Sequence, residues 1–349
     1  MRRALRFLRQ GIEAIDQVLC RCAIGSKLAA AFYYLLINPR FAREQRAVLA
    51  GRLRFARAGR TASDPTLRRN IHRLEKGLLM RPRAAVFATD YIDETVAVYG
   101  RLSSLETADA EEIRWAGDVL EEYFAVVGKA DAVRAAHTHF VRVREAKQSA
   151  VYPQRVPRPQ SQIARAAIGY EDFLQLCRQR RSIRWFLERS VPTALISQAI
   201  AAAAEAPSAC NRQPFFFRWF GDRAEASNIA GIALGTAGYA EQIPGLVVIL
   251  ADLSCFPHER DRHVPYIDGS LAAMQLMLAL ETLGLGSCPI NWPDIESLER
   301  RMDEALQLPR HIRPIMLLAV GYPDPQGGVA YSAKKGSDSL LRERNDYPH

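Results

Sequence analysis

The chain has 349 residues, of which 48% are hydrophobic and 24% are charged. These values are ordinary for a globular protein, argue against a disordered or low-complexity chain, and allow two domains or one domain with a large extension. The formal net charge is +9, and it is concentrated at one end. Residues 1–70 carry fifteen Lys and Arg against four acids, which is +11, so the rest of the chain sums to about −2.

The basic segment, residues 1–70, allows several interpretations. Clustered Arg residues can contact nucleic acid, an anionic membrane or an acidic protein, and they are equally typical of a solvated helix face. No nucleic-acid-binding motif accompanies the charge, which argues against nucleic acid. A peripheral membrane or protein partner for this segment and a solvated surface therefore both stay open as hypotheses.

The cysteines and the start of the chain bear on location. The six cysteines, at 20, 22, 177, 210, 255 and 288, show no CxxC pair and no His at metal-ligand spacing, so we predict no metal site and free thiols in a reducing cytoplasm. Met1-Arg2-Arg3 is not followed by an adequate apolar signal-peptide region. Leu28–Ile37 is too short to span a bilayer, and we expect it to form a buried helix. The predicted location is the cytoplasm, with a membrane-peripheral location as the alternative.

Residues 1–150 are predicted to be almost entirely helical. Apolar residues recur at steps of three and four from Leu5 to Ile15, and the Ala- and Arg-rich stretch 41–59 favours helix. Asp64-Pro65 predicts a helix start with Asp64 as its N-cap, and Arg81-Pro82 predicts its end. The three prolines within 151–160 indicate a linker between this basic helical extension and a second domain over 161–349.

The second domain mixes helices and strands without regular alternation, which indicates an α+β fold. Helices are expected over 169–180, 193–205, 268–283 and 294–307, and strands over 215–220, 246–250, 287–290 and 315–320.

Two polar stretches stand out in this domain. Arg180, Ser182 and Arg184 alternate, so in an extended turn they would point the same way, and guanidinium forks suit phosphate oxygens. An Arg-decorated helix end is the alternative. The loop from Pro207 to Gln213 offers amides that donate and accept, as the edge of a flat ring with alternating N–H and C=O groups requires. An ordinary turn into a strand is the alternative here.

The turn after the long predicted helix contains two glycines, which allow a close approach of the backbone to a ligand, although a plain helix stop would also contain them. Cys210 and Cys288 are not predicted to be nucleophiles, because no His lies near them in sequence.

Four motifs, in this order over 161–349, resemble the nitroreductase superfamily of flavin enzymes. They are the Arg-x-Ser-x-Arg turn at 180–184, the Pro-Ser-x-x-Asn-x-Gln-Pro loop at 207–214, the Gly-Leu-Gly-Ser-Cys-x-Ile turn at 284–290 and the strand end Ala-Val-Gly-Tyr-Pro at 319–323. The resemblance implies an α+β sandwich with a central antiparallel or mixed sheet. It also implies a homodimer formed through the long helix, with two FMN molecules at the interface.

The resemblance also implies roles for individual residues. Arg180, with Arg181 and Ser182, would meet the phosphate and ribityl chain, and Arg184 would lie by the N1/O2 edge of the ring. The partner protomer's loop would contribute its own copies of Pro207, Ser208 and Asn211. The other implied contacts are Asp268 to the ribityl chain, Pro289 and Ile290 to one ring face, a backbone N–H near Asn291 or Trp292 to N5, and Lys334 to the phosphate, where the family's Lys-x-Arg motif lacks its Arg here.

The implied function is that of an FMN-dependent oxidoreductase, in which NADH or NADPH passes hydride to flavin N5 and an organic acceptor then takes it. No side chain is predicted to act as a catalytic acid or base. One alternative is a flavin oxidase or dehydrogenase that acts on a biosynthetic intermediate without nicotinamide. Another is a flavin-binding protein whose basic extension binds a membrane or partner. The minimal family has no counterpart of the N-terminal 150 residues, and the sequence selects neither the acceptor nor the nicotinamide.

Overall fold

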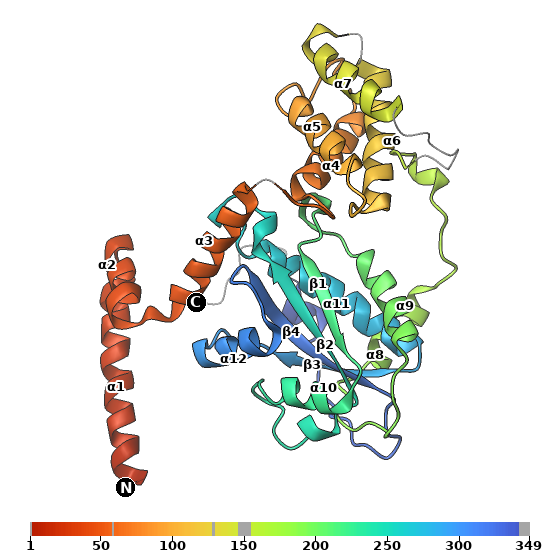
Figure 1. Cartoon of the computed structure of the whole chain (residues 1–349). Helices are drawn as coiled ribbons and strands as arrows, with labels where there is room; N and C mark the ends of the chain where they lie inside the picture. The colour runs from red at the N-terminus through yellow and green to blue at the C-terminus, as the bar shows by residue number, and fades with distance from the viewer. Residues whose placement is uncertain (1, 58, 128–129, 146–154, 342–349) are drawn as a thin grey trace.

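The structure, a computed structural model, describes residues 2–57, 59–127, 130–145 and 155–341. Its N-terminal part is helical and its C-terminal part combines helices with one sheet (Figure 1). The N-terminal α-helices are α1 (Arg2–Ala23), α2 (Lys27–Phe32), α3 (Ala42–Ala56), α4 (Pro65–Leu79), α5 (Ile92–Ser103), α6 (Ala110–Val127) and α7 (Arg134–Glu145).

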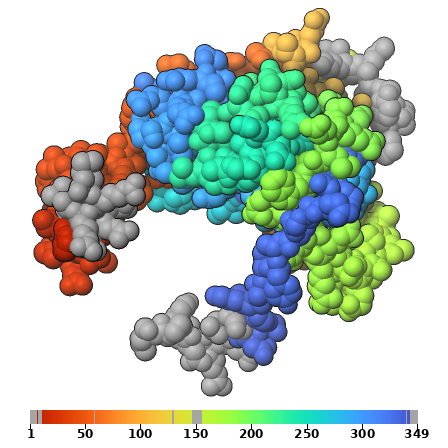
Figure 2. Space-filling view, turned by 90° about the horizontal axis from the view of Figure 1, so that it is seen from below, coloured from red at the N-terminus to blue at the C-terminus, as the bar shows by residue number. Residues whose placement is uncertain are grey.

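Helices α1 and α2 form an arm that stands off the rest of the molecule (Figures 1 and 2). A π-helical turn, η1 (Tyr33–Ile37), and a short 3-10 turn, η2 (Pro39–Phe41), connect the arm to α3. The prediction that Leu28–Ile37 is buried is wrong, because within this stretch only Tyr33 is buried, where its hydroxyl donates to Asp16 Oδ1 at 2.5 Å. Leu28, Leu35, Leu36 and Ile37 are more than half exposed in the single chain. No helix in the described ranges is long and apolar enough to cross a membrane.

Helices α4 to α7 form a bundle with its own hydrophobic core. Leu67, Ile71 and Leu74 of α4 recur at helical spacing and are fully buried against α5 and α6. The predicted start of α4 is confirmed, because Asp64 is its N-cap and accepts a hydrogen bond from Thr66 N at 2.9 Å. Short 3-10 turns, η3 (Asp131–Val133) and η4 (Gln160–Gln162), lie before α7 and before the second part of the chain. Residues 151–154 of the predicted linker lie outside the described residues.

The C-terminal part is built on a four-stranded antiparallel sheet in the order β1-β2-β4-β3. The strands are β1 (Phe215–Phe220), β2 (Gly245–Asp252), β3 (Gly286–Asn291) and β4 (Ile312–Gly321). The central strands, β2 and β4, are apolar on both faces because helices cover both faces. These helices are α8 (Tyr170–Gln179), α9 (Thr193–Ala204), α10 (Arg223–Ala230), α11 (Val264–Thr282) and α12 (Glu296–Leu306), followed near the C-terminus by the short α13 (Ser337–Leu340).

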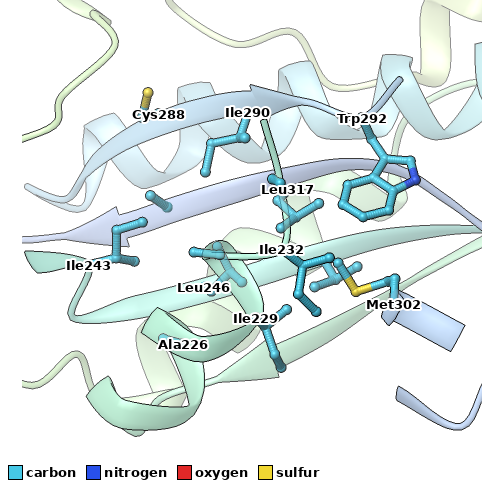
Figure 3. Packing of buried hydrophobic residues seen from close by; sticks show 14 of the residues in the cluster. Ala226, Ile229, Ile232, Ile243, Leu246, Cys288, Ile290, Trp292, Met302 and Leu317 are labelled. Carbon is cyan, nitrogen blue, oxygen red and sulfur yellow. The ribbon is translucent and has the colours of Figure 1, made fainter. Parts of the chain in front are cut away.

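The two faces of the sheet carry separate cores. Helices α9 and α11 pack on one face over Val247, Ile249 and Leu318. Helices α10 and α12 pack on the other, over Leu246 and Leu317 (Figure 3). The remaining 3-10 turns lie in the connections: η5 (Ala209–Asn211), η6 (Ala240–Gln242), η7 (Leu253–Cys255) and η8 (Glu259–Asp261). The predicted α+β fold with a preceding all-helical extension is confirmed.

A buried polar network attaches α3 to the sheet. Arg43 of α3 donates to Glu299 at 2.6 Å and to Asp303 at 2.8 Å, and Arg313 of β4 pairs with the same Glu299 at 3.1 Å. Glu299 also accepts from the indole N–H of Trp292 at 2.7 Å. This carboxylate therefore has the partners that a buried charge requires.

Helix α11 is apolar around its circumference, yet one stripe of it is not covered. Ile267, Leu271 and Met274 are 57%, 45% and 38% exposed in the single chain, and their spacing places them on one side of the helix.

Helix α11 begins four residues before its predicted start, with Pro265 in its first turn. After β4, the C-terminal segment leaves the body and extends outward (Figure 2).

Candidate functional site

The Arg turn follows α8 directly. Arg180 is the C-cap of α8, where its N–H bonds to the Leu176 carbonyl at 3.0 Å. Ser182 then pairs with Ser287 of β3 in a parallel bridge, and Ile183 N donates to the Ser287 carbonyl at 2.9 Å. The turn is therefore extended, the condition under which Arg180, Ser182 and Arg184 would point the same way, and it adds a short parallel edge to the antiparallel sheet.

The predicted phosphate residues line one small cavity of about 80 Å³. Arg181 donates to the carbonyls of Ala330, at 2.6 Å, and Tyr331, which fixes the C-terminal segment across the turn. The other predicted site residues that line this cavity are Arg180, Ser182, Arg184 and Lys334. The sequence places Lys334 about 150 residues from the turn, so only the fold could bring its charge to the same cavity.

This cavity suits a phosphate. Arg180 Nε is buried and has no hydrogen-bond partner within the described residues, and a buried guanidinium donor without a partner is costly unless an acceptor is supplied. The cavity has four cationic side chains and no acidic lining residue. A phosphate dianion would satisfy the free donor and neutralise part of this charge.

The amide-bearing loop, Pro207 to Gln213, has an unusual backbone. Cys210, Asn211 and Gln213 have φ of 53°, 50° and 49°, in the left-handed region that non-glycine residues rarely adopt. Ser208 Oγ accepts from Gln213 N at 3.0 Å, which closes the loop. Backbone strain of this kind persists where the surroundings enforce it and is frequent at ligand sites.

Asp268 of α11 lies under this loop. Its carboxylate is buried and accepts from Ala209 N at 3.0 Å. Burial raises the pKa of Asp268, while the Ala209 bond and the charge of Arg212 act in the opposite direction. In the single chain Asp268 therefore positions the loop, and its contact to a ribityl chain stays a prediction.

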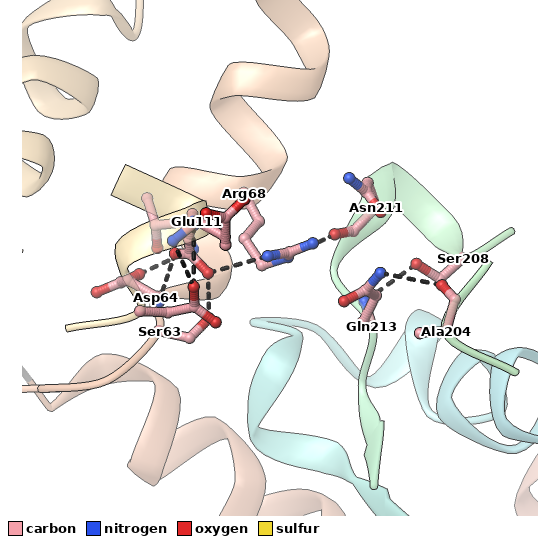
Figure 4. Close-up of polar contacts among 11 residues, drawn as sticks. Ser63, Asp64, Arg68, Glu111, Ala204, Ser208, Asn211 and Gln213 are labelled. Atoms are coloured by element: carbon pink, nitrogen blue, oxygen red, sulfur yellow. Dashed lines mark hydrogen bonds and ion pairs between the residues drawn. The ribbon is translucent and has the colours of Figure 1, made fainter. Parts of the chain in front are cut away.

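The N-terminal extension holds the loop from the other side (Figure 4). Arg68 of α4 donates through Nε to the Asn211 carbonyl at 2.7 Å and pairs through Nη1 with Glu112 at 3.0 Å. Glu112 is buried and also accepts from Ser63 Oγ at 2.5 Å and from Asp64 N at 3.1 Å. Arg68 thus connects the helical bundle to the loop, a role that no local sequence signal indicates.

We expect Arg68→Met to destabilise the protein. The side chains of Arg68 and Glu112 are 14% and 1% exposed, so the substitution leaves a buried carboxylate without its cation and costs about 3–5 kcal/mol of unfolding free energy. Chemical denaturation measures this change. Arg134→Met is the control, because the Arg134–Asp131 pair is 71% and 86% exposed, and its loss should cost less than about 1 kcal/mol. Equal losses of unfolding free energy in the two variants would contradict the role of Arg68 in connecting the helical bundle to the loop.

The predicted ring contacts lie along β3 and just after it. Ile290 and Trp292 point into the core between the sheet and α12 (Figure 3), whereas Pro289 is half-buried and Asn291 is exposed. Ile290 could therefore contact a flavin ring only through its backbone atoms, because its side chain lies in the core. The contacts of Pro289, Asn291 and Trp292 to a flavin stay predictions.

A tyrosine that no sequence signal indicated, Tyr239, lies beside the Arg turn. The guanidinium of Arg184 lies 6.0 Å from the ring centroid of Tyr239. Burial, followed by the neighbouring Cys288, raises the pKa of Tyr239 to about 12, so this phenol is neutral at physiological pH. Burial also raises the pKa of the Cys288 thiol, opposed by Arg184, which agrees with an unreactive cysteine. Tyr239 lies in no motif that points to a flavin site.

The two halves of the predicted site line different cavities in the part of the chain that the structure describes. The Arg turn lines the small cavity with the C-terminal segment. The loop, through Ala209, Cys210 and Arg212, lines a second cavity of about 380 Å³ with α4 and the segment around η8. Arg212 was not among the predicted site residues, although it lies inside the loop motif. Among the described residues, no cluster of His, Cys, Asp or Glu could hold a metal ion.

Over its C-terminal part the chain is similar to known proteins. The model of the nitroreductase family matches residues 177–248 and 233–322. An NADH dehydrogenase of Thermus thermophilus is 31% identical over 180 residues, which cover 43% of this chain and 85% of that protein. An FMN reductase (NADPH) of Bacillus subtilis is 28% identical over 41% of this chain and 62% of its own. A solved FMN-dependent nitroreductase of Clostridium difficile is 24% identical, with a TM-score of 0.41, and covers 50% of this chain and 99% of its own. From residue 177 to residue 322, at least, this chain belongs to the nitroreductase family.

Proposed function

We propose that this chain is an FMN-dependent oxidoreductase that uses NADH or NADPH to reduce a small organic acceptor. The observation that carries the proposal is the cavity that Arg180, Ser182, Arg184 and Lys334 line. The buried Nε of Arg180 has no hydrogen-bond partner among the residues that the structure describes. When bound, FMN supplies hydride transfer between the nicotinamide and the acceptor.

The chain's own residues then have distinct tasks. Arg180, Ser182 and Lys334 bind the phosphate, and Arg181 holds the C-terminal segment that carries Lys334. Arg184 provides fixed positive charge for the N1/O2 edge of the ring. The loop residues Pro207, Ser208 and Asn211 bind and orient the flavin ring that the partner subunit holds, and the bonds from Arg68 to Asn211 and from Ala209 to Asp268 keep the loop in place.

The proposed active unit is a homodimer formed through α11. Its exposed apolar stripe and the separation of the two half-sites in one chain both favour a second copy. A two-fold interface would bury the same stripe on both subunits, and it would bring the loop of each subunit to the Arg turn of the other.

Anaerobic reduction of the purified protein tests the function. We expect the protein to bind FMN and to lose the absorbance of oxidised flavin rapidly when NADH or NADPH is added. A flavin that neither nicotinamide reduces would favour the alternative, an oxidase or dehydrogenase that acts on a biosynthetic intermediate. Nitroaromatics, quinones and free flavin are the acceptors to compare in turnover, because the family fold does not select among them.

We also propose that the N-terminal arm binds the surface of an anionic membrane. Apolar side chains along it, including Ile12, Ile15 and Phe32, are more than half exposed, and residues 2–32 carry six Lys and Arg against two acids, a net charge of +4. An amphipathic, cationic helix of this type lies in the headgroup region of a bilayer. The predicted location is then cytoplasmic and membrane-peripheral.

Vesicle flotation of the full chain is the check for the arm. We expect flotation with vesicles that contain anionic lipid, and release as salt is raised, because each basic residue near the surface contributes about 1 kcal/mol. Ile12→Glu combined with Phe32→Glu should abolish flotation, whereas Leu234→Glu, at an exposed apolar residue outside the arm, should not. Equal flotation with neutral vesicles, or none at all, would contradict a charge-assisted membrane contact.

A further inference from the structure

The cavity of about 380 Å³ beside the loop is rich in arginine. Arg69 and Arg73 come from α4, Arg212 from the loop and Arg260 from η8, and Asp261 is the acidic residue among the lining side chains. The four guanidiniums and one carboxylate give a net charge of +3. The volume suits part of a small molecule rather than a macromolecule.

Arg212 is the buried cation of this group. Its guanidinium lies 4.6 Å from the ring centroid of Phe256, and its Nε is buried without a hydrogen-bond partner in the described part of the chain. Burial lowers the pKa of Arg212, and the charge of Arg69 adds to this effect. Asp261 and Asp268 offset part of this effect, and an anion that bonded to the guanidinium would stabilise its charge further.

The neighbouring arginines keep charge available for a ligand. Arg69 pairs with Glu94 at 3.1 Å, and Arg73 lies 3.6 Å from Asp90, but both carboxylates are more than half exposed. Such pairs are weak and solvent-screened. Arg260 is itself largely exposed, with Asp261 at 3.7 Å. The lining of the cavity therefore combines one buried cation, Arg212, with partly or largely exposed cations.

We infer that this cavity binds the phosphate monoester of the molecule that reacts at the neighbouring subunit's flavin. The inference rests on the proposed function, in which the loop of one subunit reaches the flavin of the other. A phosphate monoester carries close to two negative charges at neutral pH and matches the fork geometry of several arginines. The group could belong to the 2′-phosphate of NADPH or to a phosphorylated acceptor, and α4 of the N-terminal extension would supply half of its ligands.

Calorimetric titration of the FMN-loaded protein with inorganic phosphate, at constant ionic strength, tests the site. We expect weak saturable binding, on the order of millimolar, that Arg212→Gln weakens at least about tenfold. Arg260→Gln, an exposed side chain whose loss should not disturb folding, is expected to weaken it by a smaller factor. Arg134→Gln, on α7 outside the cavity, is the control. Unchanged phosphate binding in both cavity variants would overturn the inference.

Steady-state kinetics then identify the source of the phosphate. A selective rise in KM for NADPH over NADH in the Arg260→Gln variant supports the nicotinamide 2′-phosphate. Weakened phosphate binding with an unchanged ratio of the two KM values supports a phosphorylated acceptor. Flavin absorbance is recorded separately, so a protein that holds no FMN reports failure of the proposed function. If no FMN is bound, inorganic phosphate could also enter the cavity at Arg180. The difference in phosphate affinity between wild type and Arg212→Gln then still measures binding at the Arg212 cavity, because the Arg180 cavity is the same in both proteins.

Discussion

Arg180→Ala is expected to yield a protein that loses FMN during purification. Removing a charged donor from a phosphate costs about 1.5–3 kcal/mol, which corresponds to an affinity about 10- to 100-fold weaker. The loss should be large for this residue because Arg180 contributes a buried donor that has no other partner among the described residues. Fluorescence titration of the apoprotein with FMN measures it.

Arg178→Ala is the matched control for this substitution. Arg178 lies two residues earlier, in the last turn of α8, and is exposed, so it should change the affinity little. The same titration with riboflavin, which lacks the phosphate, should show no difference between Arg180→Ala and wild type. Equal weakening of riboflavin and FMN would place Arg180 away from the phosphate.

Leu271→Glu is expected to convert the dimer into monomers that do not retain flavin. Leu271 lies at the centre of the exposed stripe on α11, and a two-fold interface would contain it twice. Burial of a leucine side chain contributes about 1.5–3 kcal/mol, and two buried glutamates would add an unpaired charge on each side. Analytical ultracentrifugation and flavin absorbance, measured on the same sample, report both effects.

Leu49→Glu serves as the control for the dimer experiment. Leu49 lies on α3 and is about as exposed as Leu271, so it tests whether any added surface charge has the same effect. A Leu271→Glu protein that stays dimeric would show that another surface forms the interface. A monomer that retains FMN with wild-type affinity would show that one chain is enough for the site.

Local signals predict much of the C-terminal part. The aromatic run Phe215–Phe220 and the apolar run at 246–250 are strands because β-branched and aromatic side chains suit a covered sheet, and both lie within observed strands. The Asp64-Pro65 start of α4 follows from capping geometry. The alternation of Arg180, Ser182 and Arg184 indicates a shared direction only once the turn is known to be extended, which the bridge from Ser182 to Ser287 shows.

Other features depend on contacts between distant segments, which one sequence does not show. The burial expected for Leu28–Ile37 is wrong because hydrophobicity does not say whether a partner element exists. Arg68 reaches Asn211 across 143 residues, and Arg212 acquires its neighbours only when α4 packs beside the loop. The predicted domain boundaries, with a helical extension over 1–150 and a flavin domain over 161–349, stay predictions. The contact between Arg68 and Asn211 crosses this division.

In the proposed dimer, one FMN is held between two subunits, by the Arg turn of one and the loop of the other. Subunit mixing is the measurement that distinguishes this arrangement from a site within one chain. Arg180→Ala removes one half of the site, and Asn211→Asp places a negative charge in the other half while keeping a residue that tolerates the left-handed backbone. Each variant alone should bind FMN poorly. When the two are mixed and allowed to exchange subunits, the account predicts heterodimers with one intact site and recovery of tight FMN binding. No recovery, with subunit exchange verified, would contradict it.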